Sequence, residues 1–309
     1  MVQMKTPAVA APIASDQKCI WIASYPKSGN TWLRVFLHNL FRLIDNPSTS
    51  PQDINRLHEY TDWELRPGDY DKLLGKPSLD ATPAEIAEAR FRVQTRLAAS
   101  KPGAFLVKTH NAVASVGGYP TVNVDVTLAA IYLVRNPLDV AISYAHHSGI
   151  SIDRTIASME DEKLITSKSR LNVYEFLGSW SFHVASWLSL PHRPVYLMRY
   201  EDMLADPVSA FTALAKYLRL KANAAQIEAA INMSHFGELA AQEDKNGFNE
   251  RPKQAPKFFR SGKAGQWREV LTQAQIRAVV SAHAPMMQRC GYLPPDVGGD
   301  LVLVGNHPK

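Results

Sequence analysis

One segment near the start of the sequence has the residue types that bind a phosphate group. Residues 25–32 read Tyr-Pro-Lys-Ser-Gly-Asn-Thr-Trp and follow a short apolar run at 19–23. A loop between a strand and a helix presents backbone N–H groups and the positive end of the helix dipole to an anion. Gly29 lets the backbone approach the anion closely, and Lys27 adds a mobile positive charge. Neutral donors complete this predicted phosphate-binding loop: Ser28, Asn30 and Thr31.

The same loop differs from the loop that binds ATP together with magnesium. An ATP-binding P-loop has the pattern G-x-x-x-x-G-K-[ST], in which the lysine follows the second glycine and the hydroxyl binds Mg²⁺. Here Lys27 precedes the only glycine of the loop, Gly29. The sequence of this loop therefore does not organise magnesium. From local composition alone, an ordinary strand–helix turn with a solvated lysine stays open as the alternative.

Two further segments place reactive side chains directly after apolar runs. His110 follows 105–107 after two residues, and Arg135 follows the run 129–134. The carboxyl ends of parallel strands meet at one edge of a sheet, where the sites of α/β proteins assemble. Imidazole titrates at about pH 6.5, so His110 could accept a hydroxyl proton near neutrality. The Arg135 guanidinium could share a phosphate with the start of the next helix. Taken alone, His110 could equally be structural and Arg135 a surface ion-pair residue.

The elements that must position these residues alternate between strands and helices. Four apolar runs are continuous, as expected for strands covered on both faces: 19–23, 105–107, 129–134 and 195–198. Apolar periodicity and capping residues predict helices between and after them: 31–43, 84–99, 137–147, 173–189, 207–219 and 272–283. Residues 44–82 carry many Pro, Asp and Gly and are expected to be irregular. This alternation predicts an α/β fold with a parallel sheet and right-handed connections.

Length and composition exclude several classes of protein. The chain has 309 residues, of which 46% are hydrophobic and 20% are charged, which is too apolar for a disordered chain and too polar for a membrane bundle. No run of about 18 apolar residues is present. The net charge is +5, from 34 Lys and Arg against 29 Asp and Glu. These basic residues recur singly rather than in blocks, which favours a small anionic ligand over nucleic acid or a membrane surface.

The remaining sequence features concern domain organisation and metals. Cys19 and Cys290 form no paired metal-ligand spacing, so we predict no metal site. We expect one domain at 18–293 between disordered tails at 1–17 and 294–309, in a cytoplasmic protein.

The predicted phosphate-binding loop resembles the 5′-phosphosulfate loop of the cytosolic-type sulfotransferases. That family takes a sulfuryl group from 3′-phosphoadenosine 5′-phosphosulfate (PAPS), and its loop reads Y-P-K-S-G-T-T-W, from which this chain departs only at Asn30. Three later segments match in the same order. Residues 108–110 resemble the family's K-T-H, and 133–144 resemble its 3′-phosphate site. Residues 260–268 resemble its R-K-G-x-x-G-D-W-K segment.

The resemblance, which runs from about residue 19 to residue 268, implies a fold and a reaction. The fold would be a P-loop-like three-layer arrangement with a central parallel sheet flanked by helices. The reaction would transfer the sulfuryl group of PAPS to a hydroxyl of a small-molecule acceptor and release adenosine 3′,5′-bisphosphate (PAP), without a metal. His110 would act as general base, and Lys27 and Lys108 would stabilise charge on the leaving oxygen. The nucleotide-binding residues implied are Lys27, Ser28, Gly29, Asn30 and Thr31 at the 5′ end, Arg135, Ser143, Arg260, Ser261 and Gly262 at the 3′-phosphate, and Trp32, Tyr200, Ser234 and Phe236 at the adenine.

Departures from the family pattern leave some properties open. Ser261 stands where the family has lysine and Gln266 where it has aspartate, which predicts weaker or more salt-sensitive nucleotide binding. The family's dimerisation pattern is poorly kept at 268–277, so the oligomeric state is open. The acceptor is open as well: a phenol, a lipid or natural-product alcohol, or a sugar hydroxyl. Segments 44–104 and 146–180 are expected to form its pocket, and their aromatic residues favour a flat or apolar molecule.

Two other functions and one dynamic property complete the sequence-based expectations. A P-loop-like kinase would use ATP and Mg²⁺ and would need a carboxylate at a strand end. A non-catalytic nucleotide-binding module would tolerate the loss of His110. Residues 241–257 are polar, with Phe248 as their only large apolar residue. We therefore expect 241–265 to be mobile without nucleotide and to close over PAPS as a lid.

Overall fold

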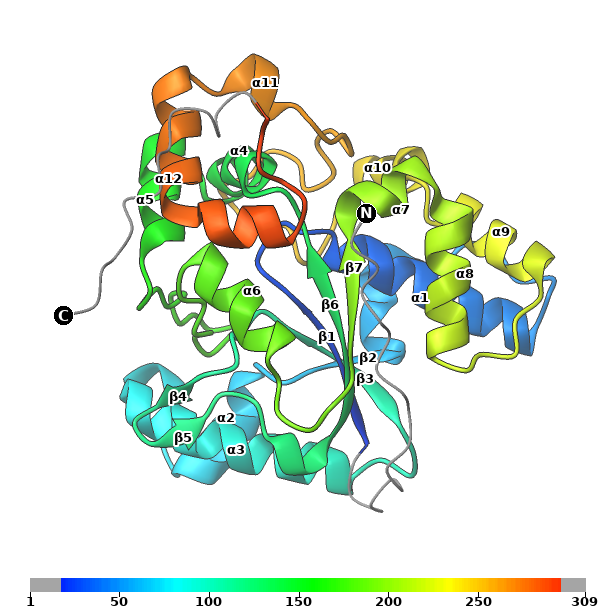
Figure 1. The fold of residues 1–309 in the computed structure, drawn as a ribbon. Helices are drawn as coiled ribbons and strands as arrows, with labels where there is room; N and C mark the ends of the chain where they lie inside the picture. Colours follow the sequence, from blue (N-terminus) through cyan, green and yellow to red (C-terminus); the bar gives the residue numbers. More distant parts are fainter. Residues whose placement is uncertain (1–17, 296–309) are drawn as a thin grey trace.

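A parallel five-stranded sheet forms the centre of the molecule in the computed structural model, which describes residues 18–295 (Figure 1). The strand order is β2-β3-β1-β6-β7, and every neighbouring pair is parallel. The expected tails lie outside the described residues, apart from the first two positions of 294–309. The strands of this sheet are β1 (Cys19–Ser24), β2 (Thr61–Trp63), β3 (Phe105–Thr109), β6 (Thr127–Val134) and β7 (Val195–Arg199), and a separate antiparallel pair is β4 (Ser115–Val116) and β5 (Tyr119–Pro120).

Helices cover both faces of the sheet, which gives the three-layer arrangement expected (Figure 1). In chain order they are α1 (Asn30–Asp45), α2 (Pro67–Leu74), α3 (Pro83–Ala99), α4 (Pro137–Ser148), α5 (Ile152–Glu160), α6 (Trp180–Leu188), α7 (Tyr200–Ala205), α8 (Pro207–Tyr217), α9 (Ala224–Met233), α10 (Phe236–Asn246), α11 (Trp267–Val270) and α12 (Gln273–Arg289). Helices α1, α8 and α9 pack on one face, and α4, α6 and α12 on the other.

The central strand β1 shows why the apolar runs are continuous. Trp21 and Ala23 join the core cluster beneath α4, α6 and α12, whereas Ile22 joins the cluster beneath α1, α8 and α9. Successive side chains of a strand point to opposite faces, so a strand covered on both sides needs an apolar residue at every position. The buried indole nitrogen of Trp21, Nε1, donates to Thr127 Oγ1 at 2.8 Å. The prediction of an α/β fold with a parallel sheet covered on both faces is confirmed.

Residues 44–82 are more regular than predicted. They contain β2 at the sheet edge, helix α2 and a 3₁₀ turn at Ile54–Glu59. The many Pro, Asp and Gly residues act as end signals rather than as an irregular coil: Pro67 begins α2, and Gly75 ends it with a φ of 67°. Tyr70 is fully buried against Ile86 of α3, and this contact fixes the short helix.

The predicted helix at 173–189 begins only at Trp180. The Ser179 hydroxyl accepts the amide of Phe182 at 3.2 Å and caps α6. The preceding residues are extended, because Thr166 donates its amide to the Glu175 carbonyl at 2.9 Å. Helices α5, α9 and α10 were absent from the prediction, as their apolar faces are short. Among residues 18–295, no helix is both long and apolar enough to cross a membrane.

Candidate active site

The predicted phosphate-binding loop between β1 and α1 has two residues with positive φ angles and several backbone amides without an acceptor in the described part of the chain. Lys27 and Gly29 adopt positive φ angles of 68° and 100°, and this region costs a non-glycine residue about 1–2 kcal/mol. A Cβ on Gly29 would lie 2.8 Å from the Tyr200 ring, so only glycine fits there. The amide N–H groups of Lys27, Ser28 and Gly29 donate to no acceptor within residues 18–295. Such a row of free donors suits an anion.

The Asn30 side chain makes contacts within the protein. Its side-chain amide turns inward and donates to the Ile22 carbonyl at 3.0 Å, and it lies 3.4 Å from Ser24 Oγ. The side chain therefore ties the start of α1 to strand β1. The Ser28 hydroxyl is also fully buried, without a partner among the described residues.

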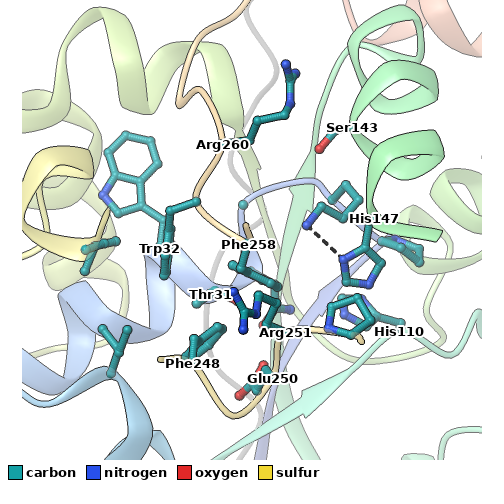
Figure 2. Close-up of a pocket in the computed structure, with 18 of the residues that line it drawn as sticks. Thr31, Trp32, His110, Ser143, His147, Phe248, Glu250, Arg251, Phe258 and Arg260 are labelled. Carbon is teal, nitrogen blue, oxygen red and sulfur yellow. Dashed lines mark hydrogen bonds between the residues drawn. The ribbon is translucent and has the colours of Figure 1, made fainter. Parts of the chain in front are cut away.

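Lys27 lies partly buried beside other positive charges. Its Nζ is 4.1 Å from the centroid of the Phe258 ring and 3.4 Å from His147 Nδ1, the contact dashed in Figure 2. Burial, followed by the charges of Arg135 and Lys108, lowers the pKa of Lys27 to about 8. An anion with several charges would relieve this repulsion.

Arg135 connects the phosphate-binding loop to the segment near residue 263. It is 7% exposed, its Nη1 donates to the Lys27 carbonyl at 3.1 Å, and its Nη2 donates to the Lys263 carbonyl at 3.0 Å. The guanidinium lies 4.3 Å from the centroid of the Tyr200 ring. Asp139 at the start of α4 holds the same segment, because its carboxylate accepts the Gly265 amide at 2.6 Å.

Hydrogen bonds fix both the orientation and the tautomer of His110. Its Nδ1 is 2.7 Å from the Ser24 carbonyl, which can only accept, so Nδ1 carries the hydrogen of the neutral ring. The lone pair therefore sits on Nε2, which has no partner in the described part of the chain. The backbone is held too: the His110 amide donates to Glu175 Oε1 at 2.7 Å, and His183 Nε2 donates to the His110 carbonyl at 2.9 Å. Burial and the nearby Lys108 charge keep the pKa of His110 well below its ordinary value.

One cavity of about 790 Å³ collects most of the residues named from the sequence (Figure 2). The predicted residues that line it are Lys27, Gly29, Asn30, Thr31, Trp32, Lys108, His110, Arg135, Ser143, Tyr200, Phe236, Arg260, Ser261 and Gly262. Ser28 and Ser234 lie outside the lining, and the Ser234 hydroxyl donates to the Ala230 carbonyl at 2.9 Å. Gly262, with a φ of 63°, is required because a Cβ would lie 2.4 Å from the Phe236 ring. Within residues 18–295, no group of three His, Cys, Asp or Glu is placed to hold a metal ion.

Part of the cavity lining comes from the two segments that the sequence assigned to the acceptor, 44–104 and 146–180. Trp63 comes from 44–104 and Glu175 from 146–180, and Tyr144 also lines the wall. Tyr70 and Tyr174 instead belong to a separate buried cluster with Ile86. The rest of the lining mixes apolar and polar side chains, and includes Ile54, Leu57, His58, Thr166, Ser167, Leu171 and Asn172.

Sequence reasoning missed several charged or polar residues of the cavity: His147, Glu175, Glu250 and Arg251. Glu250 is the most consequential, because its Oε2 lies 3.3 Å from Lys108 Nζ. Its segment precedes Arg260, and the resemblance drew attention only to the later residues. His147 follows Ser143 by four residues, which places both on the same side of α4. This spacing of four residues from Ser143 could have identified His147 as a cavity residue from the sequence.

Together, the parallel sheet, the anion-binding loop after its first strand and the cationic cavity at the strand ends define a P-loop-like α/β protein. The family model described as "Sulfotransferase domain" matches residues 17–291, and the chain belongs to this family.

Known proteins resemble the chain over most of its length. Sulfotransferase 1A1 of Canis lupus familiaris is 25% identical over 276 residues, which cover 87% of this chain and 83% of that protein. Flavonol 3-sulfotransferase of Flaveria bidentis is 24% identical and is covered to 78%, with 84% of this chain aligned. Among solved structures, mouse sulfotransferase SULT7A1 complexed with PAP has a TM-score of 0.56 at 19% identity, covering 92% of this chain and 87% of that one. Retinol dehydratase in complex with androsterone and PAP has a TM-score of 0.58 at 19% identity, covering 90% and 83%. These two structures share the fold.

Proposed function

We propose that this protein transfers the sulfuryl group of PAPS to a hydroxyl of a small-molecule acceptor. The observation that carries the proposal is the environment of Lys27, which is partly buried beside three backbone amides that have no acceptor among residues 18–295. Burial and the charges of Arg135, Lys108 and Arg260 lower the pKa of this ammonium to about 8. This arrangement fits a ligand with several negative charges, which PAPS has. Membership of the sulfotransferase family and the PAP that two structural neighbours bind support the choice.

The residues around the cavity divide into groups that fit the parts of PAPS. The amides at 27–31 and the Lys27 ammonium would hold the 5′ end. Trp32 and Tyr200 lie with ring centroids 5.8 Å apart and would contact the adenine with Phe236. The residues proposed for the 3′-phosphate are Arg135, Ser143, Arg260, Ser261 and Gly262.

His110 is the proposed general base. Its Nε2 lone pair faces the cavity, and it would take the proton of the acceptor hydroxyl as that oxygen attacks sulfur. The Ser24 carbonyl would stabilise the imidazolium through the Nδ1–H contact of 2.7 Å. PAPS supplies a sulfuryl group on a phosphate leaving group. Lys27 and Lys108 would stabilise the charge that develops on the leaving oxygen, since fixed charges of this kind are usually the largest catalytic contribution.

Calorimetry with separate nucleotides tests the proposal. PAPS and PAP should each bind with much higher affinity than ATP, with or without Mg²⁺. Tight ATP binding without a response to PAPS would favour the kinase alternative and refute the proposal. An acceptor screen with radiolabelled PAPS would then identify the hydroxyl class, and full activity of a His110→Ala variant would show that His110 is not the base.

A further inference from the structure

His147 faces the same cavity as His110, from helix α4 and four residues after Ser143 (Figure 2). Its Nδ1 lies 3.4 Å from Lys27 Nζ. A lysine ammonium has three donors and no acceptor. Lys27 is an ammonium below about pH 8. In this contact Lys27 therefore donates, and His147 Nδ1 must offer its lone pair.

His147 is neutral in this arrangement. An imidazolium would carry hydrogens on both nitrogens and would oppose the ammonium of Lys27 directly. Burial, followed by the charges of Lys27 and Lys108, lowers the pKa of His147 to about 3. A neutral ring with its lone pair on Nδ1 carries its hydrogen on Nε2. Among the described residues, nothing accepts a hydrogen bond from this Nε2–H.

His110 and His147 are thus fixed as opposite tautomers. The Ser24 carbonyl holds the hydrogen of His110 on Nδ1 and leaves a lone pair at Nε2. The Lys27 ammonium holds the hydrogen of His147 on Nε2. Of these two rings, His110 therefore offers the cavity a proton acceptor and His147 a neutral donor. The donor is anchored to the lysine of the phosphate-binding loop, on the side where the transferred group would lie.

We propose that His147 is a further catalytic residue, whose Nε2–H donates to a non-bridging oxygen of the sulfuryl group. This inference rests on the proposed sulfuryl transfer. In that reaction the bond from sulfur to the acceptor oxygen forms, and the bond from sulfur to the bridging oxygen breaks. The electron pair of the broken bond stays with the bisphosphate, the hydroxyl proton moves to His110, and His147 keeps its proton throughout. The alternative role is a spacer that only positions Lys27.

Three substitutions separate the donor role from the spacer role. His147→Gln places an amide N–H near the position of Nε2. His147→Asn places an amide oxygen near the position of Nδ1, where it can accept from Lys27, but offers no donor at Nε2. His147→Phe keeps an aromatic ring and removes both nitrogens. PAP affinity and thermal unfolding, measured for all three, verify that the fold and the nucleotide site persist.

The donor role predicts a specific order among these variants. His147→Phe and His147→Asn should each lose about 10²-fold in kcat, as expected when one preorganised donor is removed, and His147→Gln should lose the least. Calorimetry gives a readout that needs no turnover. In the Phe and Asn variants the affinity for PAPS should fall about 3- to 10-fold relative to that for PAP, which lacks the sulfuryl group. In addition, in ¹⁵N NMR of the free protein, the histidine signals that disappear in His147→Gln should belong to a neutral ring with its hydrogen on Nε2.

Several results would overturn the inference. For the kinetics, these are a wild-type kcat in His147→Asn or His147→Phe, or equal losses of kcat in His147→Gln and His147→Asn. For binding and NMR, they are an unchanged ratio of PAPS to PAP affinity in His147→Phe, or a hydrogen on Nδ1 of His147. If wild-type protein bound PAPS and catalysed transfer while one of these results held, only the role of His147 would fall. If wild-type protein failed to bind PAPS, the proposed function itself would fall.

Discussion

Glu250 and Arg34 form a bidentate ion pair across 216 residues of sequence. Arg34 Nη2 lies 2.7 Å from Glu250 Oε2, and Arg34 Nη1 lies 2.8 Å from Glu250 Oε1. The Arg34 side chain is 4% exposed and sits one turn after the phosphate-binding loop. This pair fastens the segment that follows α10 onto α1, and the same carboxylate reaches Lys108.

Loss of the Glu250 carboxylate should destabilise the protein. In Glu250→Ala the Arg34 guanidinium would stay buried without a counter-charge, which should lower the free energy of unfolding by about 2–4 kcal/mol. Urea denaturation measures the change. Asp244→Ala is the control, because its pair with Lys257 is more than half exposed on both sides, and such pairs contribute about 0–1 kcal/mol. Equal small effects in both variants would contradict the prediction.

The ion pair of Arg34 and Glu250 should make the stability of the folded protein depend on pH. Burial opposes ionisation, but the charges of Arg34 and Lys108 outweigh it and hold the pKa of Glu250 well below its ordinary value of 4.5. A carboxylate with a lowered pKa in the folded state stabilises fully above its unfolded pKa and loses this contribution as pH falls. The difference in stability between wild type and Glu250→Ala should therefore be constant above pH 6, and shrink on acidification below about pH 4.5. A difference independent of pH would show that the charge of Glu250 has no effect.

His110→Asn should abolish transfer while nucleotide binding persists. The asparagine amide can still donate to the Ser24 carbonyl, as Nδ1–H does at 2.7 Å, but nothing replaces the lone pair of Nε2. Loss of a general base typically lowers the rate about 10²–10⁴-fold. Steady-state kinetics with PAPS and calorimetry with PAP measure the two properties. Near-normal turnover would remove His110 from the catalytic role.

The pH profile should report the titration of Lys27. Its pKa is lowered to about 8, and a lysine loses its charge as pH rises through its pKa. We therefore expect kcat/KM for PAPS to fall above about pH 8, whereas the lowered pKa of His110 keeps this base neutral down to pH 6.5 and below. Lys27→Arg stays charged over this range and should lose the alkaline fall. An identical alkaline fall in this variant would assign it to another group.

The sequence predicted best those residues whose contacts are local. The apolar run of β1, the loop after it and the cap of α4 are each set by neighbours within a few residues. Asn136, for example, caps α4 because its side-chain oxygen accepts the Leu138 amide at 3.0 Å. Contacts between distant segments were not predictable in this way. His147 and Lys27 are 120 residues apart, and only the packing of α4 against the loop brings them together.

Contacts between distant segments that the sequence could not predict also hold the segment after α10. Residues 241–257 are polar in composition, yet their one large apolar residue is packed: Phe248 is 6% exposed and its ring centroid lies 4.7 Å from that of Phe258. The Glu243 carboxylate accepts the amides of Phe258 and Phe259 at 2.8 and 2.9 Å. A composition count over one window misses a cluster whose members come from several segments. The proposed mobility of this segment stays a prediction.

Arg135→Ala should mainly weaken the binding of nucleotides that carry a 3′-phosphate. Loss of a charge-assisted contact should cost PAP about 1.5–3 kcal/mol of binding free energy, whereas adenosine 5′-phosphosulfate, which lacks this phosphate, should bind almost as before. Calorimetry with both ligands decides the point. Arg135 also donates to the Lys27 and Lys263 carbonyls, so a purely structural role would weaken both ligands equally.

Nucleotide should protect the segment after α10 from trypsin. Lys253 and Lys257 are exposed there, on the chain that leads into Arg260. Arg260 is exposed too and donates to Gln266 Oε1 at 3.1 Å, so its guanidinium is available to a 3′-phosphate. If PAP orders the segment through Arg260, saturating PAP should slow cleavage after both lysines, and Arg260→Ala should remove the protection.

Cleavage elsewhere in the chain provides the internal control for this experiment. Arg219 and Lys221 are exposed between α8 and α9, outside the residues that line the cavity, so their cleavage should not respond to PAP. Protection at all four sites would indicate global stabilisation by the ligand rather than closure of one segment, because a ligand that binds only the folded state slows every cleavage that requires unfolding. Equal cleavage after Lys253 and Lys257 with and without PAP would exclude the lid.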